Sequence, residues 1–112
     1  MRPNTRRLLP LRRFVVQDTS MRPAFEPGDR VLVWQWSRRF GPGDVIVFIE
    51  PDRYLTTSVK RVASLHTDGA VNVRGDNLNV SRDSREYGPV PRARIFGRVV
   101  YRYLPGPRRG RL

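Results

Sequence analysis

Lys60 is the most informative residue for chemistry, because it is the one lysine among the 22 basic residues of the chain. Arginine keeps its proton in proteins, whereas a buried lysine can lose several pKa units and act as a base near neutral pH. Val59 and Val62 flank Lys60, and Val62 shares its face of a predicted strand. Apolar neighbours disfavour the ammonium form, so the sequence indicates Lys60 as a candidate general base.

Ser20 is the candidate nucleophile for such a base. It follows a predicted strand at residues 14–17, and a turn at the end of a strand can lift a hydroxyl clear of the sheet. A neutral Lys60 beside Ser20 could accept the hydroxyl proton and later deliver it to a leaving amine, which is the chemistry of peptide-bond hydrolysis. One serine and one lysine distant in sequence are weak support by themselves.

Other kinds of catalytic or metal site find little support in the composition. The chain has no cysteine, which removes disulfides, thiolate metal sites and cysteine nucleophiles together. Its one histidine, His66, lies in a predicted hairpin turn with Asp68 and Gly69, where we expect a solvated side chain. We therefore expect neither a Ser-His-Asp triad nor a multi-histidine metal site, and the lysine-serine chemistry requires no cofactor.

The net charge of +12 is concentrated at the two ends of the chain. Residues 1–13 hold five arginines and residues 102–112 hold four, in both cases without an acid, so +9 of the total lies there. A nucleic-acid module would more often carry a basic face with exposed aromatic residues inside the fold. Nucleic acid is therefore a disfavoured partner, whereas the arginine-rich ends suit peripheral contact with an anionic membrane.

Short strand signals separated by turns predict a mainly β fold with little helix. Two Pro-Gly-Asp turns each precede a strand, and a polar loop at residues 75–91 is long enough to suggest a function. The expected strands are residues 14–17, 30–36, 45–49, 56–63, 71–74 and 96–103.

At 112 residues the chain is expected to form one domain, spanning residues 14–104, with basic disordered tails at residues 1–13 and 105–112. The longest apolar run, residues 45–49, is far short of the roughly 20 residues needed to cross a bilayer. The apolar stretch at residues 8–11 is too short to form the apolar part of a secretory signal, and a proline interrupts it. We expect a cytoplasmic protein without a transmembrane segment.

Three short blocks carry a resemblance to a known family. Residues 20–23 have the form Ser-Met-x-Pro, residues 59–62 read Val-Lys-Arg-Val, and residues 75–90 run from Gly-Asp-Asn to Tyr-Gly-Pro-Val. In type and order these blocks resemble the signal peptidase I family of Ser-Lys serine peptidases, and the similarity covers residues 14–104. The resemblance implies a LexA/signal-peptidase-like fold of short coiled antiparallel sheets or an open barrel.

The resemblance also implies a role for each matched position. Ser20 corresponds to the nucleophile and Lys60 to the general base, and Ser81 resembles the hydroxyl that orients the lysine amine. Two further residues look like shaping residues beside the nucleophile, and two pairs resemble ion pairs that tie the third block under the site: Met21 and Pro23, then Arg61 with Asp76 and Asp83 with Arg85.

One position departs from the family pattern. The residue two before the nucleophile is often Ser or Gly in this family and sometimes an oxyanion donor, but here it is Asp18. An ionised carboxylate at that place would repel an oxyanion. Two alternatives stay open: the oxyanion hole relies on the Ser20 backbone N–H with help from Thr19, or Asp18 points away from the site.

The compact chain looks most like the small nickel-type superoxide dismutase maturation proteases of this family, and we expect neither an N-terminal membrane anchor nor a large second β-domain. The favoured hypothesis is a serine endopeptidase that removes an N-terminal leader from a protein precursor. A signal peptidase acting at a membrane surface is one alternative. A small basic β-barrel that binds nucleic acid is an alternative from another class.

Overall fold

The computed structural model describes residues 10–36, 39–79 and 82–112. Short strands predominate in this part of the chain, and the helical elements are one α-helical turn and two 3-10 turns. The prediction of a mainly β fold with little helix is confirmed. In chain order the elements are β1 (Leu11–Val15), β2 (Arg30–Trp34), β3 (Val45–Glu50), β4 (Arg53–Leu65), β5 (Val71–Arg74), α2 (Ser84–Tyr87), η1 (Arg92–Arg94), β6 (Ile95–Leu104), η2 (Gly106–Arg108) and β7 (Gly110–Arg111).

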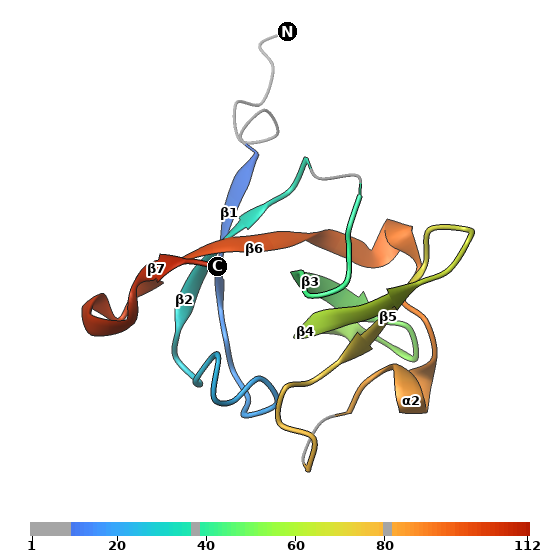
Figure 1. The fold of residues 1–112 in the computed structure, drawn as a ribbon, viewed down its shortest axis with the longest axis horizontal. Coiled ribbons are helices and arrows are strands. Elements are labelled where there is room, and N and C mark those ends of the chain that lie inside the picture. The colour runs from blue at the N-terminus through green and yellow to red at the C-terminus, as the bar shows by residue number, and fades with distance from the viewer. Residues whose placement is uncertain (1–9, 37–38, 80–81) are drawn as a thin grey trace, which may run out of the picture.

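The strands pair antiparallel in one sheet of order β1-β2-β6-β3-β4-β5, with β7 beside β6. The long strand β6 crosses the molecule and joins the β1–β2 side to the β3–β5 side (Figure 1). The sheet is not closed into a barrel. Of the two forms expected from the sequence, the open arrangement of short coiled strands is therefore the one observed.

The central strand β3 supplies two cores, one on each face of the sheet. Val45 and Val47 belong to one buried cluster, whereas Ile46 and Phe48 belong to the other. A strand buried on both faces needs a continuous apolar run rather than alternation, which is the pattern of residues 45–49. β4 pairs with β3, so the faces of β3 also decide the environment of each β4 side chain.

The two Pro-Gly-Asp turns have the same conformation, as their identical sequences predict. Gly28 and Gly43 both have φ of +93°, a region that favours glycine. In each turn the aspartate N–H bonds the carbonyl three residues earlier at 3.0 Å, and its carboxylate accepts the N–H of that same residue. Each turn thus fixes the start of the strand that follows, β2 in one case and β3 in the other.

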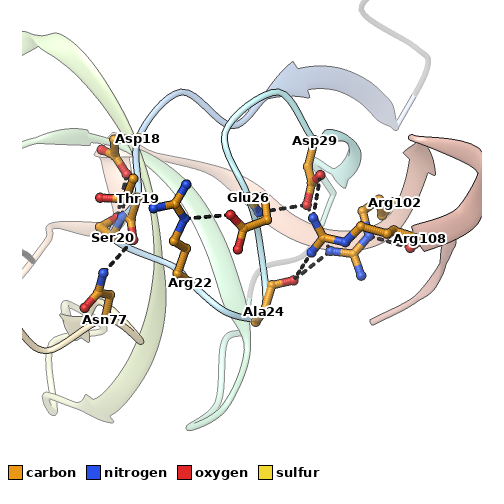
Figure 2. A network of polar contacts seen from close by, with 10 residues as sticks. All are labelled: Asp18, Thr19, Ser20, Arg22, Ala24, Glu26, Asp29, Asn77, Arg102 and Arg108. Carbon is orange, nitrogen blue, oxygen red and sulfur yellow. Dashed lines mark hydrogen bonds and ion pairs between the residues drawn. The ribbon is translucent and has the colours of Figure 1, made fainter.

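The C-terminal residues differ from the expectation of a disordered tail at residues 105–112. They form η2 and β7, and β7 pairs with β6. The reason is the buried carboxylate of Asp29, which is 2% exposed and accepts hydrogen bonds from Arg102 and Arg108 at 3.2 and 3.1 Å. The arginines counted as peripheral charge therefore include two that hold the C-terminal end against the turn before β2 (Figure 2).

At the other end, β1 begins at Leu11, so residues 11–13 of the expected N-terminal tail pair with β2. Residues 1–9 of that tail lie outside the described residues. No helix in the described part of the chain is long and apolar enough to cross a membrane.

Candidate active site

Ser20 lies in a run of turns that follows β1 and precedes β2. The side chains of Met21 and Phe25, each 1% exposed, anchor this segment in the core that Val31 and Val33 also form. The Phe25 N–H bonds the Met21 carbonyl at 2.9 Å. Burial of Met21 therefore fixes the backbone beside Ser20.

Asn77, a residue of the third sequence block, holds the turn that contains Ser20. Its backbone N–H donates to the Ser20 carbonyl at 2.8 Å, and its Nδ2 donates to the Thr19 carbonyl at 3.2 Å (Figure 2). The sequence places Asn77 in the third block but did not predict a role for it. The one sequence feature that could have indicated such a role is its position directly after Asp76 in the Gly-Asp-Asn motif.

Lys60 lies on β4 opposite Ile46 of β3, and it therefore points to the core formed by Ile46, Phe48 and Val62. Its Nζ lies 2.6 Å from Ser20 Oγ. Lys60 is 2% exposed and Ser20 4% exposed. The structure thus brings the two candidate residues into hydrogen-bonding contact away from bulk solvent.

Burial lowers the pKa of Lys60 below its ordinary value of 10.5. The carboxylates of Asp18, Glu50 and Asp83 act in the opposite direction because they stabilise the ammonium, but burial prevails. Arg82 adds a smaller effect that also lowers the pKa of Lys60. The amine is consequently easier to deprotonate than an exposed lysine would be.

Asp18 does not point away from the site, so that alternative is wrong. Its Oδ1 accepts the Ser20 backbone N–H at 3.0 Å and the Ser20 hydroxyl at 2.7 Å (Figure 2). Desolvation acts to raise the pKa of Asp18, but the hydrogen bonds from Ser20 and the charge of Lys60 outweigh it and hold the pKa below its usual range. Asp18 is thus an ionised carboxylate on the backbone amide of the candidate nucleophile.

Glu50 is a second carboxylate near the amine that sequence reasoning missed. It ends β3 and is 5% exposed, and its Oε2 accepts the Ser58 hydroxyl at 2.6 Å. Ser58 and Lys60 are two residues apart on β4 and share one face of the strand. A glutamate at the end of an apolar run would ordinarily be assigned to solvent, so the sequence offered no clear signal.

Arg61 ties the lysine strand to the third sequence block. Its Nε and Nη2 donate to the two carboxylate oxygens of Asp76 at 2.9 and 2.8 Å, and its Nη1 donates to the Gly43 carbonyl at 2.8 Å. The bonds to Asp76 raise the pKa of the guanidinium. A planar fork matched to a carboxylate sets orientation as well as distance, so this pair aligns β4 with the Asp76–Asn77 segment.

Asp83 caps the short helix α2 from a buried position. It is 1% exposed and accepts hydrogen bonds from the backbone N–H groups of Gly75 and Arg85 and from the Arg85 guanidinium. Burial acts to raise the pKa of Asp83, but these donors lower it overall. Asp83 thereby joins the start of the polar loop to the first turn of α2. Ser81, expected to orient the lysine amine, lies outside the described residues.

Pro23 and the one histidine, His66, lie outside the Ser20–Lys60 contact. Pro23 lies in the turn between Met21 and Phe25. His66 is exposed at the β4–β5 connection, where its N–H bonds the Ala70 carbonyl at 2.9 Å. The described groups at the site are therefore a hydroxyl, an amine and carboxylates, which can perform nucleophilic and acid–base chemistry.

The comparisons with known proteins agree on one family. The model described as "Signal peptidase, peptidase S26" matches residues 5–69 and 67–104. The chain belongs to this family. The S26 chain is 32% identical to mitochondrial inner membrane protease subunit 2 of Schizosaccharomyces pombe, over 87% of this chain and 67% of the relative.

Two further relatives of the S26 chain support the assignment. It is 37% identical to mitochondrial inner membrane protease subunit 1 of Xenopus tropicalis, over 77% of this chain and 65% of the relative. It is 30% identical to the probable signal peptidase I-1 of Synechocystis, over 89% of this chain and 74% of the relative. The chain thus spans about two thirds of the length of the relatives it matches. Membership of the S26 family implies a serine peptidase.

Proposed function

We propose that this protein is a serine endopeptidase that removes an N-terminal leader from a precursor protein, with Ser20 as nucleophile and Lys60 as general base. The observation that carries the proposal is the 2.6 Å contact between Lys60 Nζ and Ser20 Oγ in a buried setting. Burial favours the neutral amine, which is the form able to accept a proton. Membership of the S26 family supports the same reaction class.

In each of the two half-reactions Lys60 accepts one proton and then donates it. As Ser20 Oγ attacks the scissile carbonyl carbon, Lys60 Nζ accepts the hydroxyl proton, and the carbonyl oxygen becomes an oxyanion. When the C–N bond breaks, the Lys60 ammonium delivers that proton to the leaving amine and an acyl ester remains on Ser20. Lys60 then takes a proton from the attacking water and returns it to Ser20 Oγ, which restores the starting state.

A groove beside the dyad offers a place for the precursor. It has a volume of about 750 Å³, its two walls are residues 13–18 and residues 55–59, and Arg30 and Tyr103 complete its lining. Among the described strands, β1 pairs with β2, residues 57–59 of β4 pair with β3, and β5 pairs with β4 only from residue 61 onward, so each wall keeps one unpaired backbone edge. An extended peptide can add to such edges through main-chain hydrogen bonds. The groove reaches Asp18, two residues from Ser20.

The first precursor that we infer is that of nickel superoxide dismutase, because residues 97–105 resemble the corresponding residues of the maturation proteases of that enzyme. The curated relatives are instead named mitochondrial inner membrane proteases and a signal peptidase, so a signal-peptide precursor is the competing substrate. Comparing kcat/KM for the two leader peptides decides between them. Faster cleavage of a signal-peptide precursor would overturn the first choice and leave the peptidase proposal in place.

A membrane-surface setting is the second candidate, favoured by exposed apolar side chains near the arginine-rich start of the chain. Leu11 is 44% exposed and Trp36 is 54% exposed. Each arginine near an anionic surface contributes roughly 1 kcal/mol of attraction. Flotation with vesicles of phosphatidylcholine and phosphatidylglycerol tests this setting: salt-sensitive binding supports it, and no binding at low salt contradicts it.

The peptidase proposal is tested by cleavage of a leader-bearing precursor with three variants. Ser20→Ala removes the nucleophile, Lys60→Ala removes the base, and Lys60→Arg keeps a cation that cannot be deprotonated. We expect each to lower kcat by at least about a hundredfold, the scale of a lost acid–base group. Retained cleavage by Lys60→Arg with an unchanged circular dichroism spectrum would refute the general-base role.

A further inference from the structure

The carboxylate of Asp18 occupies the place where an oxyanion donor would be needed. During attack by Ser20 Oγ, the backbone N–H of Ser20 is close to the carbonyl oxygen that becomes negative, and such amides stabilise oxyanions. In the structure this N–H already donates to Asp18 Oδ1 at 3.0 Å. A carboxylate and an oxyanion cannot share one donor without strong like-charge repulsion. The substrate oxygen and Asp18 therefore compete for the same N–H.

The same oxygen of Asp18 also accepts a hydrogen bond from the Ser20 hydroxyl. An ionised carboxylate only accepts hydrogen bonds, so the 2.7 Å contact requires the Ser20 hydroxyl to donate to Asp18. A hydroxyl has one proton, and Lys60 Nζ must then donate to Ser20 Oγ across their 2.6 Å contact. In this arrangement the proton that Lys60 should remove points to Asp18 instead.

From these two contacts we infer that Asp18 is a third functional residue of the site, a latch that holds Ser20 in a resting state and swings aside when the scissile carbonyl binds. The inference rests on the proposed peptidase function. Once Asp18 leaves, the Ser20 N–H is available to the oxyanion and the Ser20 hydroxyl can turn its proton to Lys60.

The setting of Asp18 allows this movement. The residue is exposed and borders the groove, so its carboxylate can rotate into water without leaving a buried cavity. A peptide bound in the groove would lie directly beside it. Because charge-assisted hydrogen bonds are about twice as strong as neutral ones, a carboxylate is a firmer latch than an amide or hydroxyl at this position.

A purely local role for Asp18 has to be separated from the latch. An aspartate that bonds the N–H two residues later also stabilises a turn, whatever its neighbours. Asp68 makes the same kind of bond to the Ala70 N–H, at 2.9 Å, in the remote β4–β5 connection. Asp68→Asn is therefore a matched control that removes the same charge from the same kind of turn.

The test compares wild type, Asp18→Asn, Asp18→Gly and Asp68→Asn in kcat/KM for a leader peptide and in the affinity for a peptide aldehyde. The aldehyde forms a tetrahedral adduct whose oxygen needs the Ser20 N–H. Asparagine keeps a neutral acceptor for the turn, so Asp18→Asn is informative even where Asp18→Gly does not fold. We expect Asp18→Gly to gain about tenfold in both quantities, the size of one charge-assisted hydrogen bond, Asp18→Asn to gain less because its neutral amide still accepts the Ser20 N–H, and Asp68→Asn to match wild type.

The outcomes separate the latch from the peptidase itself. Unchanged or lower cleavage and aldehyde affinity in Asp18→Asn, with wild type active, would overturn the latch and leave the peptidase proposal standing. An equal gain in Asp68→Asn would assign the effect to overall charge and would also overturn it. Cleavage that persists when Ser20→Ala is introduced into wild type or into any of these variants would contradict the proposed function, and the latch with it.

Discussion

The backbone N–H of Asn77 donates to the carbonyl of Ser20 at 2.8 Å, and this bond joins the polar loop after β5 to the turn that carries the proposed nucleophile. The Asn77 side chain adds a bond from Nδ2 to the Thr19 carbonyl at 3.2 Å. Two successive carbonyls of the turn are therefore held by one residue. Because Lys60 approaches Ser20 from β4, the loop and the strand together fix the Ser20–Lys60 distance.

Asn77→Ala should loosen the turn without unfolding the protein. It removes the bond to Thr19 but keeps the backbone bond to Ser20, so we expect a loss of about 1 kcal/mol in the free energy of unfolding. A misplaced nucleophile slows chemistry more than binding, so kcat should fall several-fold with KM nearly unchanged. Urea unfolding and steady-state kinetics check both effects. A change in KM alone would show that Asn77 contacts substrate instead.

Glu50→Gln should shift the acid limb of the activity profile to lower pH. The Glu50 carboxylate raises the pKa of Lys60, so its removal lowers that pKa and leaves more neutral amine at a given pH. Glutamine can still accept the Ser58 hydroxyl, which preserves the local packing. The pH dependence of kcat/KM measures the shift, with the exposed Glu86→Gln as control. A limb that moves upward would contradict the assignment of this limb to Lys60.

Arg61→Lys should destabilise the protein although charge is conserved. Lysine cannot reproduce the two parallel bonds to Asp76, nor keep the Gly43 bond at the same time. We expect a loss of about 1 kcal/mol in the free energy of unfolding, because the pair is partly exposed and screened by solvent. Arg74→Lys, at an exposed β5 position, is the control. Equal stability of the two variants would show that the fork geometry has no role.

Lys60→Met should be more stable than wild type at neutral pH, because wild type must deprotonate or bury an ammonium. With a folded-state pKa below 10.5, the unfolded chain binds more protons between the two pKa values, so wild-type stability rises with pH across that window. The difference in the free energy of unfolding between Lys60→Met and wild type should therefore shrink by about 1.4 kcal/mol for each pH unit within that window. Urea unfolding of both proteins from pH 7 upward tests this, and a constant gap would contradict it.

Much of the fold could be predicted from local sequence signals. The apolar run at residues 45–49 and the two Pro-Gly-Asp turns depend on backbone preferences within a few residues, and the structure has strands and turns at those places. The C-terminal end at residues 105–112 could not be predicted in this way. Its order depends on Asp29, which lies more than seventy residues earlier in the chain.

In the candidate site, too, some features could be predicted from local sequence and others depend on contacts between distant residues. Ser20 and Lys60 were identifiable because one lysine stands against many arginines and because ordered blocks surround both residues. The direction of the Asp18 carboxylate and the contact of Glu50 with Ser58 depend on side-chain rotamers and strand register, which no local pattern encodes. Such contacts between strands require the folded arrangement.

The central claim, that Lys60 is a lysine with a depressed pKa beside Ser20, can be measured directly because the chain contains one lysine. Labelling lysine with nitrogen-15 at Nζ gives one side-chain resonance, whose chemical shift can be titrated in the folded protein and in urea. We predict that the folded protein titrates clearly below the ordinary value of 10.5 and that the unfolded chain titrates near it. A folded-state pKa at or above 10.5 would contradict the account.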